Sequence, residues 1–188
     1  IKNRTVWIRQ KLKIQTETVR PKDKEYVNGE SFTYLGRNYR LKCVSEGAGE
    51  VKLKNGYLTV TLPNGASAGA AERSVQQSLK NWYQTRALEK LKEKTKRYAA
   101  ILGVNPQSVD VKEYKARWGS CSSSGDVTYN WRIIIAPHHI VDYIVAHELC
   151  HLLEHNHGPK YWKHVQTVIP NYKECRHWLK TYGMNLKI

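Results

Sequence analysis

Residues 137–159 read PHHIVDYIVAHELCHLLEHNHGP, and the H-E-x-x-H pattern at their centre is the most informative feature of the chain. Residues four apart on a helix lie one turn apart on the same face, so His147 and His151 can both reach one metal ion. Glu148 then stands beside the ion without binding it. It is placed to take a proton from a metal-bound water, whose pKa the ion lowers to about 7, and to pass that proton to a leaving group. The pattern therefore predicts a metal-hydrolase site.

The same stretch predicts that the motif lies on a core helix. Pro137 can open a helix at its first turn. The next apolar residues follow at helical spacing and give the helix a face that packs into a core: Ile140, Val141, Ile144 and Val145. Cys150 falls on the side away from the two histidines, so we expect it to be a packed thiol.

Three residues further along the chain are candidates for a third ligand. Ligands of a tetrahedral zinc site lie about 3.4 Å apart. His155 on a continuing helix would stand about 12 Å along the axis from His147, so it can bind only if the helix breaks before it. His157 precedes a Gly-Pro pair, where the helix has stopped and the chain can fold back, so His157 is favoured. Glu174 stays open as a carboxylate alternative from a later helix.

Three separated motifs carry a resemblance to a known family. They are HELCHLLEHNHGPKYW (residues 147–162), KARWGSCSSSG (115–125) and YNWRIIIAP (129–137), and GESFTYLGRNYRLK (29–42) extends the similarity over most of the chain. The chain resembles the YgjP-like family of predicted zinc metallopeptidases, and HGPKYW is similar to the His-Gly-x-x-aromatic tract of SprT-like proteases. The resemblance implies Glu148 as the catalyst and one Zn²⁺ per chain with three ligands: His147, His151 and His157. Glu154 stands where the metzincin signature has Gly, so the turn after the helix must be made differently, near Asn156 and Gly158.

Length and composition limit the class of protein. A chain of 188 residues suggests one domain, or one domain plus a small lobe. No apolar stretch approaches the roughly 20 residues of a membrane helix, and no signal-peptide pattern opens the sequence. The four cysteines are widely spaced, so a disulfide framework is not expected. These features predict a soluble, cytoplasmic protein with no membrane partner. The first residue is Ile1 rather than Met, which suggests a trimmed or incomplete terminus.

The formal net charge of +15 is unevenly distributed. Residues 1–69 carry 13 basic and 6 acidic side chains, residues 70–118 carry 11 and 5, and residues 119–188 carry 7 and 5. The metal-bearing third is therefore almost neutral. The basic first two thirds could attract nucleic acid or another polyanion through counterion release, and ordinary solubility of a basic protein is the equal alternative.

Periodicity gives a coarse order of elements. Residues 1–62 show short alternating runs at 6–8, 33–35, 39–41 and 57–60, separated by turns, which indicates strands. After a linker at 63–69, a long helix or helix pair is predicted over about 70–102, with the basic residues 90–97 on a solvated face. Gly103 and Pro106 close it. Strands follow at 108–116 and 127–135, then the motif helix, a helix that ends at Pro170 and a last helix over 172–182. The predicted class is α+β, with a β-rich N-terminal lobe (1–69) and a zincin-like metal-binding catalytic domain (70–188).

Residues 129–135 immediately precede the motif helix and are the candidate edge strand for an extended peptide. An ordinary core strand is the alternative. Five residues here and in the preceding loop are candidates for substrate binding: Arg117, Trp118, Asn130, Trp131 and Arg132. A structural role for the loop that carries Arg117 remains open. Ser120 and Cys121 have no base at a recognisable spacing, so nucleophilic catalysis is not expected.

Three functions from different classes remain. The first hypothesis is a zinc-dependent metallopeptidase with Glu148 as general base. The second is a metal-dependent hydrolase of nucleotide phosphoanhydrides, with Arg117 and Arg132 holding phosphate, although no Gly-rich phosphate loop is present. The third is a nucleic-acid-binding module with a structural metal, which three ligands and a free Glu disfavour. A protease recruited to DNA would combine the first hypothesis with the charge pattern.

Overall fold

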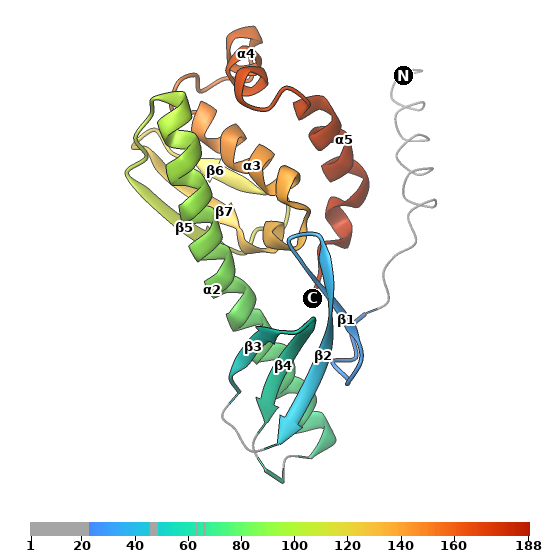
Figure 1. The fold of residues 1–188 in the computed structure, drawn as a ribbon. Coiled ribbons are helices and arrows are strands. Elements are labelled where there is room, and N and C mark those ends of the chain that lie inside the picture. Colours follow the sequence, from blue (N-terminus) through green and yellow to red (C-terminus); the bar gives the residue numbers. More distant parts are fainter. Residues whose placement is uncertain (1–22, 46–48, 63, 66) are drawn as a thin grey trace, which may run out of the picture.

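The computed structural model describes residues 23–45, 49–62, 64–65 and 67–188. Two small sheets lie toward opposite ends of one long helix, α2 (Ala68–Leu102), and the C-terminal helices lie beside the second sheet (Figure 1). This is the α+β class that the sequence predicts. None of the helices in the described part of the chain is both long and apolar enough to cross a membrane.

The first sheet has the strand order β1-β2-β4-β3, with β1 (Ser31–Tyr34), β2 (Arg37–Ser45), β3 (Val51–Lys54) and β4 (Tyr57–Leu62). The outer pairs are antiparallel, and β2 and β4 run parallel in the centre. The strands predicted near residues 33–41 and 57–60 are confirmed. The strand predicted at 6–8 lies outside the described residues. One face of the sheet is apolar and packs on α2: Phe32, Leu41, Leu58 and Val60 are buried.

Helix α2 connects the two sheets. Its 35 residues correspond to about 52 Å. Its apolar positions recur at helical spacing and are buried: Val75, Leu79, Tyr83, Leu91 and Tyr98. The helix ends as predicted at Gly103, whose φ of 66° is the left-handed conformation that favours glycine at a helix C-terminus.

The second sheet corrects one prediction. It has the order β5-β7-β6, with β5 (Ser108–Lys112), β6 (Gly119–Cys121) and β7 (Asp126–Asn130), so β7 is the central strand. Residues 129–135 are therefore not an edge strand. The strand ends at Asn130, and Trp131–Ile135 form a 3₁₀ helix, η1, because the side chain of Asn130 caps the backbone N–H of Arg132 at 3.2 Å. The edge strand beside the motif helix is β6.

The C-terminal third is helical. Helix α3 (His138–Cys150) carries the motif, and Pro137 precedes it as the N-cap rather than standing in its first turn. Helices α4 (Pro159–Val168) and α5 (Tyr172–Tyr182) follow as predicted, and a short 3₁₀ helix, η2 (Gly183–Asn185), precedes the C-terminus. The apolar face predicted for α3 is buried: Ile140, Val141, Ile144 and Val145.

The first sheet contacts the metal-bearing part directly. The turn between β1 and β2 docks on η1, with Leu35 N donating to Ile134 O at 2.8 Å and Gly36 N donating to Ile135 O at 3.3 Å. A Cβ at position 36 would lie 2.9 Å from the Cα of Pro137, so only glycine fits against the start of α3. One hydrophobic core therefore runs through both ends of the described chain. The division at residue 69 stays a prediction.

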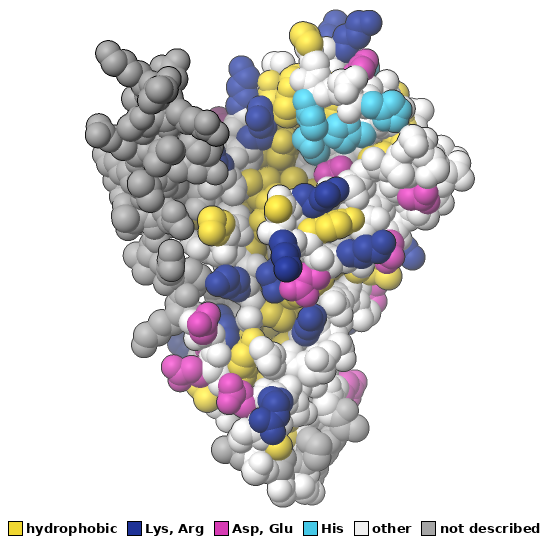
Figure 2. Space-filling view, turned by 180° about the vertical axis from the view of Figure 1, so that it is seen from behind, with side chains coloured by type: hydrophobic (Ala, Val, Ile, Leu, Met, Phe, Trp, Pro, Cys, Tyr) yellow, Lys and Arg dark blue, Asp and Glu magenta, His cyan; other side chains and the backbone are white. Residues whose placement is uncertain are grey.

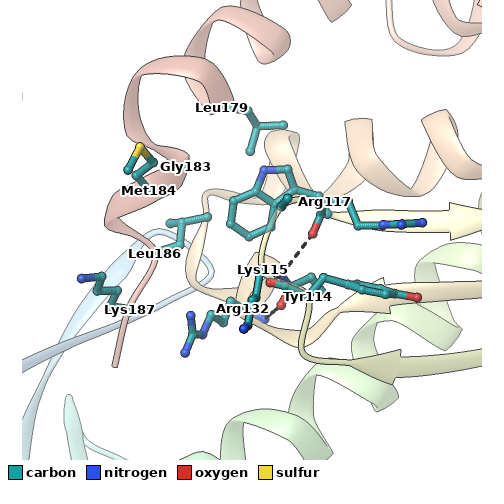
Figure 3. A pocket seen from close by; sticks show the side chains of 12 residues that line it. Tyr114, Lys115, Arg117, Arg132, Leu179, Gly183, Met184, Leu186 and Lys187 are labelled. Atoms are coloured by element: carbon teal, nitrogen blue, oxygen red, sulfur yellow. Dashed lines mark hydrogen bonds between the residues drawn. The ribbon is translucent and has the colours of Figure 1, made fainter. Parts of the chain in front are cut away.

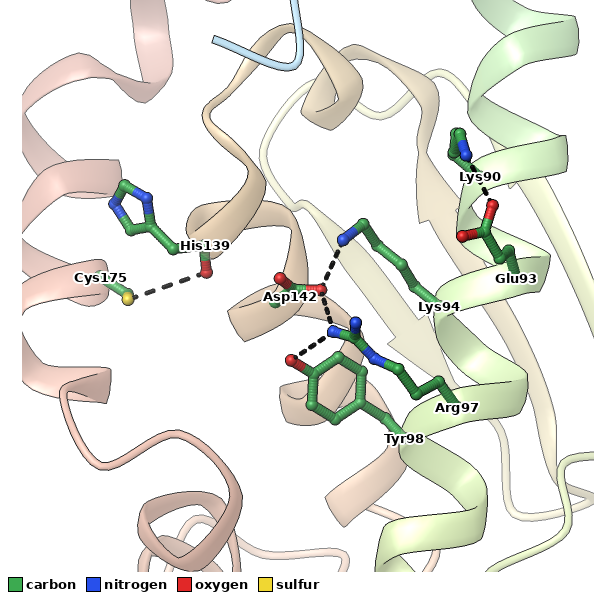
Figure 4. A network of polar contacts seen from close by, with 8 residues as sticks. All are labelled: Lys90, Glu93, Lys94, Arg97, Tyr98, His139, Asp142 and Cys175. Carbon is green, nitrogen blue, oxygen red and sulfur yellow. Dashed lines mark hydrogen bonds and ion pairs between the residues drawn. The ribbon is translucent and has the colours of Figure 1, made fainter.

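A polar network joins α2 to α3 (Figure 4). Lys94 is only 7% exposed, and its Nζ lies 2.7 Å from Oδ1 of Asp142 on α3. Arg97 donates to the same oxygen at 3.1 Å and lies against the ring of Tyr98. The prediction of a solvated basic face over residues 90–97 is thus wrong for Lys94, because the helix turns this position toward α3.

Candidate metal centre

Helix α3 supplies the first two histidines. Its buried apolar face fixes its rotation, and this turns His147 and His151, one turn apart, toward the same side. The regular helix ends at Cys150 and His151 is its C-cap, followed by a tight turn in which Leu152 N donates to Leu149 O at 3.0 Å. The helix therefore stops earlier than the turn expected near Asn156 and Gly158.

The loop after α3 brings the third histidine back. Nε2 of His157 lies 3.3 Å from Nε2 of His147, and the ligand atoms of His147, His151 and His157 all lie within 4.8 Å of one another. The separation of the two Nε2 atoms is close to the roughly 3.4 Å between ligands of a tetrahedral zinc ion. Neither His155 nor Glu174 belongs to this group. Figure 2 shows a cluster of histidine side chains at the surface of one face of the molecule.

Aromatic residues hold the three imidazoles. The Tyr143 hydroxyl lies 3.4 Å from Nδ1 of His147, and the Tyr161 hydroxyl donates to the His147 carbonyl oxygen at 2.8 Å. Trp162 Nε1 donates to the carbonyl oxygen of His157 at 3.1 Å, and its ring stacks on the imidazole of His157 at 5.6 Å. A partner at Nδ1 of His147 leaves Nε2 to face a metal.

Burial keeps the histidines neutral. It lowers the pKa of His147 to about 3, with further lowering by the neighbouring His151 and His157. Burial also lowers the pKa of His151 and of His157. Neutral imidazoles are the form that binds metal, so three such nitrogens within reach of one point fit a divalent ion of borderline softness such as zinc.

Glu148 lies next to the histidine group and is 5% exposed. Burial raises the pKa of its carboxyl to about 8, and the positive charge of Arg117 opposes that rise. On strand β6, a Cβ at Gly119 would lie 2.6 Å from both Cγ and Oε1 of Glu148. The carboxylate therefore lies directly beneath the edge strand, where any side chain at position 119 would displace it.

The candidate substrate-binding residues divide into two groups. Trp131 is 1% exposed and Asn130 is 3% exposed, so each presents little surface to a substrate, and their assignment to substrate binding stays a prediction. Asn130 is structural, because its Nδ2 donates to the carbonyl oxygens of Tyr114 and Arg117 at 3.0 and 3.2 Å. The remaining three line a surface pocket near β6, to which Asn130 also contributes: Arg117, Trp118 and Arg132.

Four residues of the site were not identified in the sequence: Gly119, Tyr143, Tyr161 and Arg176. The i, i+4 spacing of Tyr143 and His147 on one helix was an available signal. Arg176 lies on α5, with its guanidinium 4.5 Å from the ring centre of Trp162, and no local pattern links it to the motif. Cys150 is buried as predicted, and burial raises the pKa of its thiol to about 12.

Comparisons with known proteins agree with the motif. The model of the YgjP-like family, described as a metallopeptidase domain, matches residues 1–182. Among solved structures, the metallopeptidase zymogen abylysin of Pyrococcus abyssi is 24% identical, with a TM-score of 0.44 over 48% of this chain and 93% of that chain. The metallopeptidase zymogen jannalysin of Methanocaldococcus jannaschii is 19% identical, with a TM-score of 0.39 over 45% and 90%. No curated protein shows a significant match.

The family match covers all of the elements that build the site, from the first sheet through α5. The resemblance seen in the separated sequence motifs is therefore confirmed. The H-E-x-x-H helix, the third histidine and the buried glutamate all lie within the matched residues. The chain belongs to the YgjP-like family of metallopeptidase domains, and it is a metal-dependent peptidase that acts on peptide or protein substrates.

Proposed function

We propose that the chain is a zinc peptidase that holds one zinc ion per chain with His147, His151 and His157. The close approach of three neutral imidazoles supports this ligand set. A divalent ion in an open three-ligand site acts as a Lewis acid that polarises a peptide carbonyl and makes water nucleophilic near neutral pH.

Glu148 is the proposed general base and acid. It takes one proton as the oxygen of water bonds to the carbonyl carbon, and it returns that proton to the nitrogen as the carbon–nitrogen bond breaks. Burial raises its pKa to about 8 and the nearby Arg117 opposes that rise, and a divalent ion held by the three histidines would lower the pKa further. A group with a near-neutral pKa can serve in both steps.

Strand β6 is the proposed docking edge for the substrate. Within the described residues only β7 pairs with it, so its other edge can accept an extended peptide by β-augmentation. A peptide there would pass over Gly119, and hence over Glu148. The single observation that carries the proposal is this placement of a buried glutamate between the histidine group and a free strand edge.

The remaining partner predictions are not part of this proposal. Two basic side chains of α2 form ion pairs within the chain: Lys90 lies 2.6 Å from Glu93, and Lys94 lies 2.7 Å from Asp142. Binding of nucleic acid therefore stays a prediction, as does hydrolysis of nucleotides. The four cysteines are all free thiols, which supports a reducing compartment such as the cytoplasm.

The decisive test is the Glu148→Gln variant. It should bind zinc and fold like the wild type, because glutamine has nearly the same shape. Its turnover of a fluorogenic peptide should fall by about 10²–10⁴-fold, which is the usual contribution of a general acid–base group. Turnover, zinc content and circular dichroism should be measured on the same preparations. Undiminished turnover in a zinc-loaded variant would disprove the role of Glu148.

A further inference from the structure

A surface pocket of about 350 Å³ opens beside the proposed docking edge (Figure 3). One wall is the loop of residues 114–118 together with Arg132. The other wall is the C-terminal segment, which contributes Leu179, Gly183, Met184, Leu186 and Lys187. Gly183 allows this segment to pack closely on Trp118, since a Cβ at position 183 would lie 3.1 Å from the Trp118 ring. The two walls are thus packed on one another through the indole of Trp118.

The pocket is lined by cations and by no acidic side chain. Its charged residues are Lys115, Arg117, Arg132 and Lys187. Arg132 is paired with Glu113 at 2.7 Å, whereas the other three form no ion pair within the described residues. Arg117 lies over the ring of Tyr114 at 5.4 Å, and both side chains extend away from the C-terminal wall (Figure 3). An anionic group entering here would meet Lys115 and Lys187, neither of which forms an ion pair in the described structure, whereas the charge of Arg117 is near Glu148.

The pocket is close to the reacting groups. Arg117 is two residues before Gly119, and two residues span at most about 7 Å. Gly119 contacts Glu148, and Arg117 is close enough to lower the pKa of that carboxyl. An extended peptide rises about 3.3 Å per residue. A peptide on β6 would therefore place a side chain two or three residues from the cleaved bond at the mouth of the pocket.

We propose that this pocket, which we call the basic pocket, is a specificity subsite for a carboxylate of the peptide substrate. The proposal rests on the proposed peptidase function. The carboxylate belongs either to an Asp or Glu side chain or to the C-terminus of the peptide. Trp118, Leu179 and Leu186 supply an apolar surface for the aliphatic part of such a residue, while Lys115 and Lys187 bind its charge.

Cleavage of matched peptides tests the proposal on the zinc-loaded protein. The peptides differ in one residue, Glu, Gln or Lys, placed one to four positions from the cleaved bond on either side, and a second set compares a free C-terminus with an amide. Exposed ion pairs contribute a few-fold each, so Lys115 and Lys187 together should raise kcat/KM about tenfold for the carboxylate over the neutral peptide. The set that responds identifies the source of the carboxylate. Equal kcat/KM for Glu, Gln and Lys at every position, with no effect of the free C-terminus, contradicts the subsite.

Charge-reversal variants locate the effect. The double variant Lys115→Glu/Lys187→Glu should lose or reverse the preference, because both side chains line the basic pocket and are exposed enough to change without unfolding the chain. The matched control is Lys42→Glu/Lys54→Glu, which changes the net charge equally at two exposed positions of the first sheet. It should keep the preference. A similar loss in both double variants would show that net charge, and not this pocket, selects the substrate, and the proposal would be wrong.

A binding measurement separates this proposal from the proposed function. The zinc-loaded Glu148→Gln protein, titrated with the same peptides by calorimetry, should bind the carboxylate peptide about tenfold more tightly than its lysine counterpart. Equal affinities overturn the subsite even if peptides are cleaved. Selective binding without any cleavage by the wild type supports the subsite and overturns the proposed function. If a short single-stranded DNA displaces the peptide at equal concentration, the pocket serves nucleic acid instead and the proposal fails.

Discussion

At the scale of single residues, the site depends on a position without a side chain. Gly119 has no positive φ that would require glycine. Its Cβ is excluded only because the carboxylate of Glu148 fills that space, with both Cγ and Oε1 2.6 Å from the Cβ position. The position of the Glu148 side chain therefore explains why residue 119 is a glycine, and Glu148 in turn lies against strand β6.

Gly119→Ala should displace Glu148 without removing the metal ligands. We expect a loss of stability of about 1–3 kcal/mol from overpacking. A shift of about 1 Å in the carboxylate should lower kcat by about 10²-fold. Urea denaturation and turnover of a peptide measure the two effects.

A double-mutant cycle shows whether Glu148 is the cause. In the Glu148→Ala background, which removes Cγ and the carboxylate, adding Gly119→Ala should cost less than about 0.5 kcal/mol of stability. If the cost is the same in both backgrounds, the alanine clashes with something other than Glu148, and this account of Gly119 is wrong.

At the scale of elements, α2 and α3 are joined by a pair of charges within an apolar interface. Lys94 and Asp142 are only 9% and 16% exposed at their side chains, so both charged groups are largely removed from water and lie against one another. Removing Lys94 leaves Asp142 with only the more exposed Arg97 as a cationic partner within the described residues, which is more costly than losing a surface pair. This network also fixes α3, the helix that carries the metal ligands, against the longest helix of the molecule (Figure 4).

Lys94→Glu should therefore lower the free energy of unfolding by at least about 3 kcal/mol, because it places two carboxylates together in a poorly solvated interface. The matched control is Lys96→Glu, two residues away on an exposed position of the same helix. It should change stability by no more than about 0.5 kcal/mol. Urea denaturation of both variants makes the comparison. Equal losses of stability in the two variants would mean that the contact between Lys94 and Asp142 does not stabilise the fold.

At the scale of the whole molecule, we expect the chain to fold without the metal. The core contains apolar residues from both sheets and from the described helices, and the histidine group lies at its margin. Small zinc-dependent domains derive about 10–16 kcal/mol from the metal and unfold without it. This chain has a large core of its own, so the contribution of the metal to folding should be smaller.

Chelation of the metal should lower Tm by several degrees and leave the circular dichroism spectrum at 25 °C almost unchanged. His157→Ala should lose most of the bound zinc, because it removes one of three ligands. His155→Ala, an exposed histidine of the same loop, is the matched control and should retain it. The zinc content of both variants should be measured by metal analysis after dialysis. Zinc retained in His157→Ala but lost in Glu174→Ala would overturn the assignment of the third ligand.

The sequence alone determined the local features of the molecule. The spacing of His147, Glu148 and His151 fixes their shared side on a helix, because the helical repeat does not depend on the rest of the chain. The end of α2 at Gly103 and the burial of the apolar face of α3 followed from equally local rules. The α+β class and the family also followed from patterns that are contiguous in the sequence.

Only the tertiary structure decided which distant segments meet. Residues 129–135 have the composition of a strand, but the strand ends at Asn130, and pairing on both sides makes β7 central. The edge strand is instead β6, a segment of three residues that is too short to show any periodicity. In the sequence, Lys94 is one of several lysines and Gly119 belongs to a run of small residues. Only the structure shows that Lys94 pairs with Asp142 on α3 and that Gly119 lies against Glu148. Sequence periodicity reports which face of an element is apolar, whereas strand order and side-chain contacts depend on long-range packing that no local pattern encodes.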